Sequence, residues 1–151
     1  MTLAHASLDC WSLLVLKASR ALQDAQQQSA QGQARLEQLL ASESKIQAML
    51  IDYRRQHLER GADPKLMADD LNHRQFLAQL QQVLDRAVRA TSAARRDCER
   101  LAQAVLAARR ELDKAEKLEA HAREKERRLA GRAEQKRQDD LATMRYQWRE
   151  A

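Results

Sequence analysis

The sequence predicts an all-α fold in which two long helices form an antiparallel coiled-coil hairpin, with the second helix overhanging at its C-terminal end. Of the 151 residues, 32% are charged and 3% are aromatic, with three Gly and one Pro. Strong helix formers therefore dominate the composition, and residues that favour turns are scarce. A heptad pattern of apolar residues runs along both parts of the chain and is interrupted near residue 62. We expect one folding unit over residues 1–151.

The first helix is expected over about residues 3–60. From Leu8 to His57, its seam residues recur at steps of three and four, as the a and d positions of a heptad do. The repeat is weakest from Ser29 to Gly32, inside the stretch "QDAQQQSAQGQA". Small seam residues allow a partner helix to approach closely but bury little area, so we expect this region to be the loosest.

The chain is expected to turn over about residues 61–66. Gly61 suits the left-handed position that ends many helices. Asp63 followed by Pro64 suits an N-cap and a first helical turn. The stretch "MADDL", which begins at Met67, offers a second possible start. Both starts remain open on the sequence.

The second helix is expected over about residues 67–145. Its seam recurs from Leu77 to Ala115 and becomes poorer from Glu119 to Ala133. Two matched seams on either side of one turn favour a helical hairpin. Association of the two helices between different chains would also satisfy the pattern.

Pairing the helices outward from the turn gives a register. It places Tyr53 near residues 73–76 and Cys98 near Ser29, whereas Cys10 lies opposite residue 117 or so. At 1.5 Å per residue, the two sulfur atoms would be on the order of 30 Å apart. We therefore expect no disulfide within the chain.

The first helix is expected to end before the second, leaving residues from about 126 to 151 without a partner helix. This overhang is highly charged and contains Gly131, so it would fray if it stayed alone. It also carries Tyr146 and Trp148, two rings with nothing of their own to pack on. A docking segment and a disordered end are both compatible with this composition.

No pattern in the sequence indicates an enzyme. The four histidines, His5, His57, His73 and His121, lack neighbours at metal-ligand spacing, although His57 and His73 could approach one another near the turn. The glycines are isolated, so there is no phosphate-binding loop. We expect no catalytic residue, no metal, no cofactor and no small-molecule substrate.

The sequence also lacks signals for membrane insertion and secretion. Its longest apolar run, Leu13 to Leu16, is far shorter than the roughly 20 residues that a membrane span needs. Asp9, and no basic residue, comes before that run, which is not the pattern of a signal peptide. We expect a cytoplasmic protein. Its net charge of +5 favours acidic partners without naming them.

Positive charge is concentrated between Arg86 and Arg110, where seven arginines stand against Asp97 and Glu99. Arginines at helical spacing could bind phosphates, but no aromatic residue lies between them for base stacking. We interpret this stretch as a solvated face. An acidic protein surface or nucleic acid would be the alternative ligands of this stretch. For the protein as a whole, a nucleic-acid-binding coiled coil and a structural dimer are the alternatives.

A patch of apolar residues near the turn is larger than a two-helix seam requires. Phe76 and Val83 are displaced to one side of the seam, so the patch spills onto an exposed flank. Exposed aromatic patches usually mark a partner site, although the extra bulk could also lock this end of the hairpin. The apolar patch comprises Leu50, Tyr53, His57, Phe76, Leu80, Val83 and Ala87.

Several stretches of the chain resemble the FliJ family. "LIDYRRQHLERG" and "NHRQFLAQL" resemble the middle of those proteins, and "EQKRQDDLATMR" resembles their tail. The opening "CWSLLVLKASRALQDA" is compatible but less specific. Together these stretches span residues 8 to 145 or so. Related injectisome proteins of the YscO type are the alternative within the same group.

The resemblance implies a soluble component of the bacterial flagellar type III export apparatus, peripherally associated with the inner membrane. Such proteins are hairpins similar to the central stalk of rotary ATP synthases. They bind a FliI-like hexameric export ATPase, an FlhA-like export gate protein and export chaperones, and we expect a monomer in their absence. Whether the hairpin rotates or only promotes assembly of the ATPase stays open.

The resemblance also assigns surfaces to these partners. It implies that the apolar patch binds the export gate, although His57 stands where the family often has another ring. It implies that the basic overhang enters the ATPase ring. The overhang residues expected there are Arg123, Arg127, Arg128, Arg132, Lys136 and Arg137.

Overall fold

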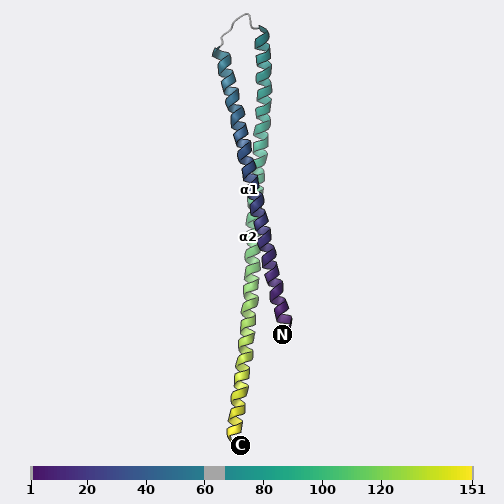
Figure 1. Ribbon diagram of the computed structural model, residues 1–151, viewed down its shortest axis with the longest axis vertical. Coiled ribbons are helices and arrows are strands. Elements are labelled where there is room, and N and C mark those ends of the chain that lie inside the picture. The colour runs from purple at the N-terminus through teal and green to yellow at the C-terminus, as the bar shows by residue number, and fades with distance from the viewer. Residues whose placement is uncertain (1, 60–66, 151) are drawn as a thin grey trace. The chain divides into compact units, whose positions relative to one another are not determined.

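A computed structural model describes residues 2–59 and 67–150, and gives the environment of the side chains of residues 9–59 and 70–149. These residues form helix α1 (Thr2–Glu59) and helix α2 (Met67–Glu150) (Figure 1). No strand occurs in them, so the predicted all-α class is confirmed. The expected turn, with Gly61, Asp63 and Pro64, lies outside the described residues.

Helix α2 extends five residues beyond the expected end near residue 145 and reaches Glu150. After Gly131 the sequence contains no Pro and no Gly, so no residue there interrupts the backbone hydrogen bonds of the helix. Pairs of opposite charge at helical spacing add support along both helices, for example Arg55 with Asp52 at 2.6 Å and Lys114 with Glu111 at 2.8 Å. Each exposed pair of this kind contributes about 0.2–0.5 kcal/mol.

The chain divides into two compact units. Unit 2 comprises Ala25–Val105, and unit 1 comprises Met1–Asp24 together with Leu106–Ala151. Each unit contains one segment of α1 and one segment of α2, which run antiparallel to one another (Figure 1). The heptad pattern continues through both boundaries, so this division was not predicted.

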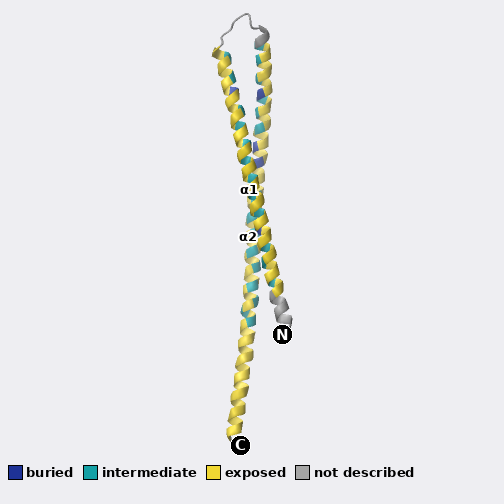
Figure 2. Cartoon of the chain, viewed as in Figure 1, coloured by how far each residue is buried: buried dark blue, intermediate teal, exposed yellow. Residues whose placement is uncertain are grey.

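The core of unit 2 follows the predicted seam. Leu50, Leu80, Ala94 and Thr91 are buried, and the other predicted seam positions are half-buried, whereas most residues between them are exposed (Figure 2). Burial at every third or fourth residue is the pattern of a coiled-coil interface. The two seams read from the sequence are thus the two contact faces of the helices.

The weak stretch of the first seam is a place of close helix contact. A Cβ atom added at Gly32 would lie 2.7 Å from Cδ1 of Leu101 and 3.8 Å from Sγ of Cys98. Glycine is therefore the residue that leaves room for Leu101 to pack against the α1 backbone. Cys98, which was expected near Ser29, lies close to Gly32, three residues further along α1.

In unit 1 the paired region is short. Leu22 is buried, and Ser12 Oγ donates a hydrogen bond of 2.8 Å to Oε1 of Glu119 across the two helices. Half-buried positions on α2 end at Glu126, and every residue from 127 to 149 is exposed (Figure 2). Residues 127–149, here called the overhang, therefore begin one residue after the expected position.

No helix in the described ranges combines the length and the apolarity needed to cross a membrane.

Candidate functional site

Four rings meet where α1 and α2 approach the turn. The ring centroids of Tyr53 and Phe76 are 4.6 Å apart, with their planes tilted by 50°. Tyr53 also stacks on His73 at 4.3 Å, and His73 stacks on His57 at 4.0 Å. The rings alternate between the helices, so they join α1 to α2 rather than extending along either helix. The expected proximity of Tyr53 to residues 73–76, and of His57 to His73, is confirmed.

Polar contacts flank this ring cluster. His57 Nε2 lies 3.4 Å from Oδ1 of Asp70, and Arg74 also approaches that carboxylate, at 2.8 Å. Further along, Arg54 donates a hydrogen bond of 3.3 Å to the side chain of Gln81. The contacts of His57 with Asp70 and of Arg54 with Gln81 join the two helices, whereas that of Arg74 with Asp70 lies within α2. All three are largely exposed, so the two contacts between helices fix the register more than they add to stability.

The apolar patch separates into a floor and an exposed edge. Leu50 and Leu80 are buried with 5% and 8% of their surface exposed, so they belong to the core of unit 2. Tyr53, His57 and Ala87 are half-buried. Phe76 and Val83 keep 41% and 43% of their surface exposed, as their displacement from the seam predicts. These two side chains are the part of the patch that a partner can reach.

Met49 was not among the expected patch residues, although it lies beside them. It precedes Tyr53 by four residues on α1 and is 54% exposed. The signal was present in the sequence, since Met49 is an apolar residue one position off the seam. A partner lying on the exposed edge could therefore contact both helices.

The basic residues expected in the overhang region are mostly held by neighbouring carboxylates. Arg123 contacts Glu119 at 2.6 Å, and the same carboxylate accepts the hydrogen bond from Ser12. Arg127 and Arg128 both contact Glu124, at 3.2 and 2.9 Å. The hydrogen bond from Arg128, and the charges of Arg127 and Arg128, hold the pKa of Glu124 below its ordinary value of 4.5.

The remaining three residues of that set lie further along α2. Arg137 contacts Glu134 at 3.5 Å. Arg132 and Lys136 have no carboxylate partner among the residues that the structure describes. Within the apolar patch, the structure thus links Tyr53, His57 and Phe76 through ring contacts in which His73 takes part. The basic residues are spread along the exposed part of α2.

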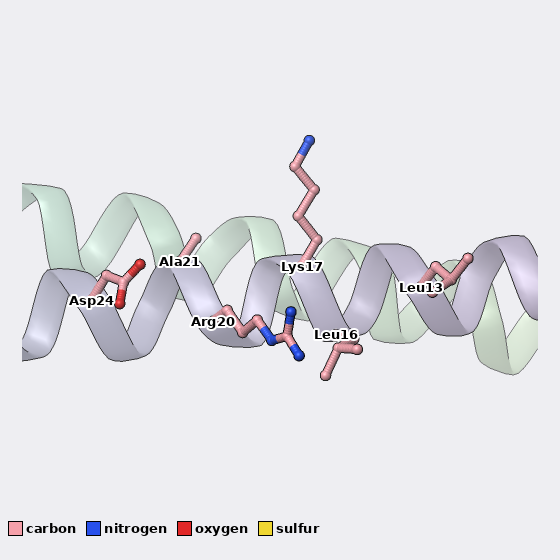
Figure 3. A pocket seen from close by; sticks show the side chains of 6 residues that line it. All are labelled: Leu13, Leu16, Lys17, Arg20, Ala21 and Asp24. Atoms are coloured by element: carbon pink, nitrogen blue, oxygen red, sulfur yellow. The ribbon is translucent and has the colours of Figure 1, made fainter.

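A hollow on the surface of α1, in unit 1, has a volume of about 450 Å³. The residues that line this hollow all belong to α1, and their side chains point in different directions (Figure 3). Such a depression cannot surround a substrate. It is lined by Leu13, Leu16, Lys17, Arg20, Ala21 and Asp24.

Side chains that could perform chemistry are also dispersed in the described ranges. No group of three or more His, Cys, Asp or Glu residues there has the arrangement of a metal site. Cys10 and Cys98 are free thiols.

Comparison with known proteins identifies the family. The model of the family described as "Flagellar FliJ protein" matches residues 13–151. Comparisons with curated proteins and with solved structures gave no match. The family match covers nearly the whole chain and includes the ring cluster, the apolar patch and the overhang. The chain therefore belongs to the FliJ family, and this membership makes it a component of the flagellar protein export apparatus.

Proposed function

We propose that this protein is a stalk-like hairpin that binds the hexameric export ATPase and the export gate protein and also contacts export chaperones. It acts by binding and has no catalytic activity of its own. It is a cytoplasmic monomer before it joins the apparatus at the inner membrane. The observation that carries the proposal is the exposed edge formed by Phe76 and Val83 above the buried floor of Leu50 and Leu80, in a chain of the FliJ family.

The exposed edge is the surface proposed for the export gate. Binding surfaces commonly place a few aromatic or aliphatic anchors on a rigid support. Here the ring stack of Tyr53, His73 and His57 supplies the support, since it joins both helices beneath Phe76. A partner gains apolar contact with Phe76 and Val83 without having to open the coiled coil.

The overhang is the surface proposed for the export ATPase. It contains seven basic and three acidic residues, a net charge of +4, and α1 does not cover it. Arg132 and Lys136 are the two residues of the basic set that have no carboxylate partner among the described residues, so they are proposed to pair with acidic groups of the ring.

ATP hydrolysis by the cognate export ATPase tests the proposed contact between the overhang and the ATPase. The full chain is expected to stimulate hydrolysis, whereas a chain truncated after Glu126 keeps the paired region and is expected to lose the effect. Equal stimulation by both chains would place the contact elsewhere. No stimulation by the full chain, with an ATPase that forms hexamers, would reject the stalk role.

Binding to the cytoplasmic part of the gate protein tests the proposed contact between the exposed edge and the gate. The double variant Phe76→Ala/Val83→Ala is expected to weaken binding at least tenfold while leaving helicity unchanged, because both side chains are about 40% exposed. Val88→Ala is the matched control, since Val88 has a similar exposure of 41% but lies on another side of α2. Equal losses in the double variant and the control would contradict the assignment.

A further inference from the structure

The end of the overhang carries a stripe of exposed apolar side chains. Leu141, Met144 and Trp148 follow one another at steps of three and four, so they share one face of α2. Their exposed fractions are 53%, 58% and 86%. Nothing in the described part of the chain covers them, since every residue from 127 to 149 is exposed.

This stripe does not continue the coiled-coil seam. Steps of three and four from the last half-buried residue, Glu126, lead along α2 to Lys136, Asp140 and Thr143. A helix that prolonged the pairing seen in unit 1 would therefore meet polar side chains. The apolar stripe lies on another side of α2, so a partner other than a helix paired along the seam would cover it.

The charges around the stripe indicate that partner. Arg145 follows Leu141 by four residues and Arg149 follows Arg145 by four, so both arginines border the stripe. Neither has an ion pair among the described residues. The overhang as a whole has a net charge of +4, and residues 137–149, with three arginines and two aspartates, contribute +1 of it. Two overhangs would therefore repel each other, whereas an anionic surface would attract them.

We propose that residues 137–149 form an amphipathic segment that binds the surface of an anionic phospholipid membrane. Leu141, Met144 and Trp148 enter the boundary between headgroups and acyl chains, and Arg145 and Arg149 contact lipid phosphates. Basic amphipathic helices bind membranes in this way, and tryptophan favours the interface. The apolar stripe gives affinity for the bilayer, while the arginines select anionic lipid.

The proposal goes beyond the export function and does not depend on it. The ATPase contact was assigned to cationic residues nearer the start of the overhang, whereas lipid binding uses the apolar stripe at its end. The two activities can therefore be measured separately, with vesicles in the absence of the ATPase and with the ATPase in the absence of vesicles.

Fluorescence of Trp148 provides the direct test. The chain has two tryptophans, so a full-length Trp11→Phe variant leaves Trp148 as the reporter. Vesicles with about a third phosphatidylglycerol are expected to shift its emission to shorter wavelength, because the ring leaves water. Pure phosphatidylcholine vesicles are expected to bind at least tenfold more weakly, and added salt should weaken binding to the anionic vesicles.

Co-sedimentation with the same vesicles identifies the residues. Leu141→Ser/Met144→Ser is expected to reduce the bound fraction at least fivefold. Tyr146→Ala is the matched control: Tyr146 is 65% exposed and lies two residues from both Met144 and Trp148, away from the stripe. Its substitution is expected to leave binding nearly unchanged.

Three results would overturn the proposal. The first is unshifted Trp148 emission with anionic vesicles. The second is a shift caused by the export ATPase but not by vesicles, which would identify a protein as the occupant. The third is a shift without lipid that grows with protein concentration and accompanies a doubled mass in light scattering, which would identify a second copy of the chain.

Discussion

Tyr53 of α1 and Phe76 of α2 form a ring pair whose centroids are 4.6 Å apart, yet the two side chains differ in environment. Tyr53 is half-buried between Phe76 and His73, whereas Phe76 keeps 41% of its surface exposed. The pair therefore connects the helix interface to the protein surface. One ring holds the hairpin together, and the other is available to a partner.

This difference predicts unequal effects on stability. Tyr53→Ala removes contacts with two rings and is expected to cost about 2 kcal/mol, whereas Phe76→Ala is expected to cost roughly 1 kcal/mol because much of its ring is already in water. Urea denaturation followed by circular dichroism would measure both. A larger loss for Phe76→Ala would show that its ring belongs to the core.

The two helical glycines predict opposite responses to alanine. Nothing lies within 4 Å of a Cβ added at Gly131, so Gly131→Ala is expected to stabilise α2 by about 1 kcal/mol through helix propensity alone. The same change at Gly32 brings a Cβ to 2.7 Å from Leu101 Cδ1, so the side chain must move and most of the gain is lost. Thermal unfolding of the two variants tests this difference. An equal gain in stability for both variants would contradict the prediction.

The sequence predicted the helices and their contact faces because burial in a coiled coil depends mainly on heptad position. Leu50, Leu80 and Ala94 could be placed in the core by counting alone. Phe76 could be placed on the exposed flank for the same reason. Periodicity also located the start of the overhang to within one residue.

Side-chain pairing was harder to predict, because it depends on rotamers and on the exact register across the helices. The arginines at 127 and 128 were expected to contact the export ATPase, and their pairing with Glu124 was not predicted. Their spacing of three and four residues from Glu124 could have suggested this. The contact between His57 and Asp70 depends on how the helices meet beyond the turn, which no local pattern encodes.

The carboxylate of Glu124 predicts an acid-sensitive step in the overhang region. Its folded-state pKa is lowered by Arg128 and Arg127, so the ionised form stabilises the helix above pH 4.5, and this contribution is lost as the pH falls below that value. Glu124→Gln removes the titrating group and is expected to flatten that part of the helicity profile. Circular dichroism between about pH 7 and pH 3 measures the profile.

Glu116→Gln is the control for this effect. Glu116 lies on the same helix in unit 1, is exposed, and has no ion pair among the described residues. Its substitution is expected to leave the shape of the profile unchanged. Identical profiles for Glu124→Gln and Glu116→Gln would show that the two arginines do not hold Glu124 in solution.

The contact between Gly32 and Cys98 predicts an engineered disulfide that reports the register of the hairpin. A Cβ at residue 32 would lie 3.8 Å from Cys98 Sγ, so Gly32→Cys places two thiols within bonding reach once Leu101 changes rotamer. In a Cys10→Ser background, oxidation is expected to give a cross-linked monomer that migrates faster on non-reducing gels. Closing a loop of this length would stabilise the fold by up to roughly 4 kcal/mol.

Gln33→Cys is the matched control, because residue 33 is exposed and lies off the seam. It is expected to remain reduced or to form only slow cross-links between chains. A disulfide-linked dimer from Gly32→Cys at low protein concentration would mean that the two seams pair between chains. The two helices would then form as described but would pair with helices of another chain, and the antiparallel hairpin within one chain would be wrong.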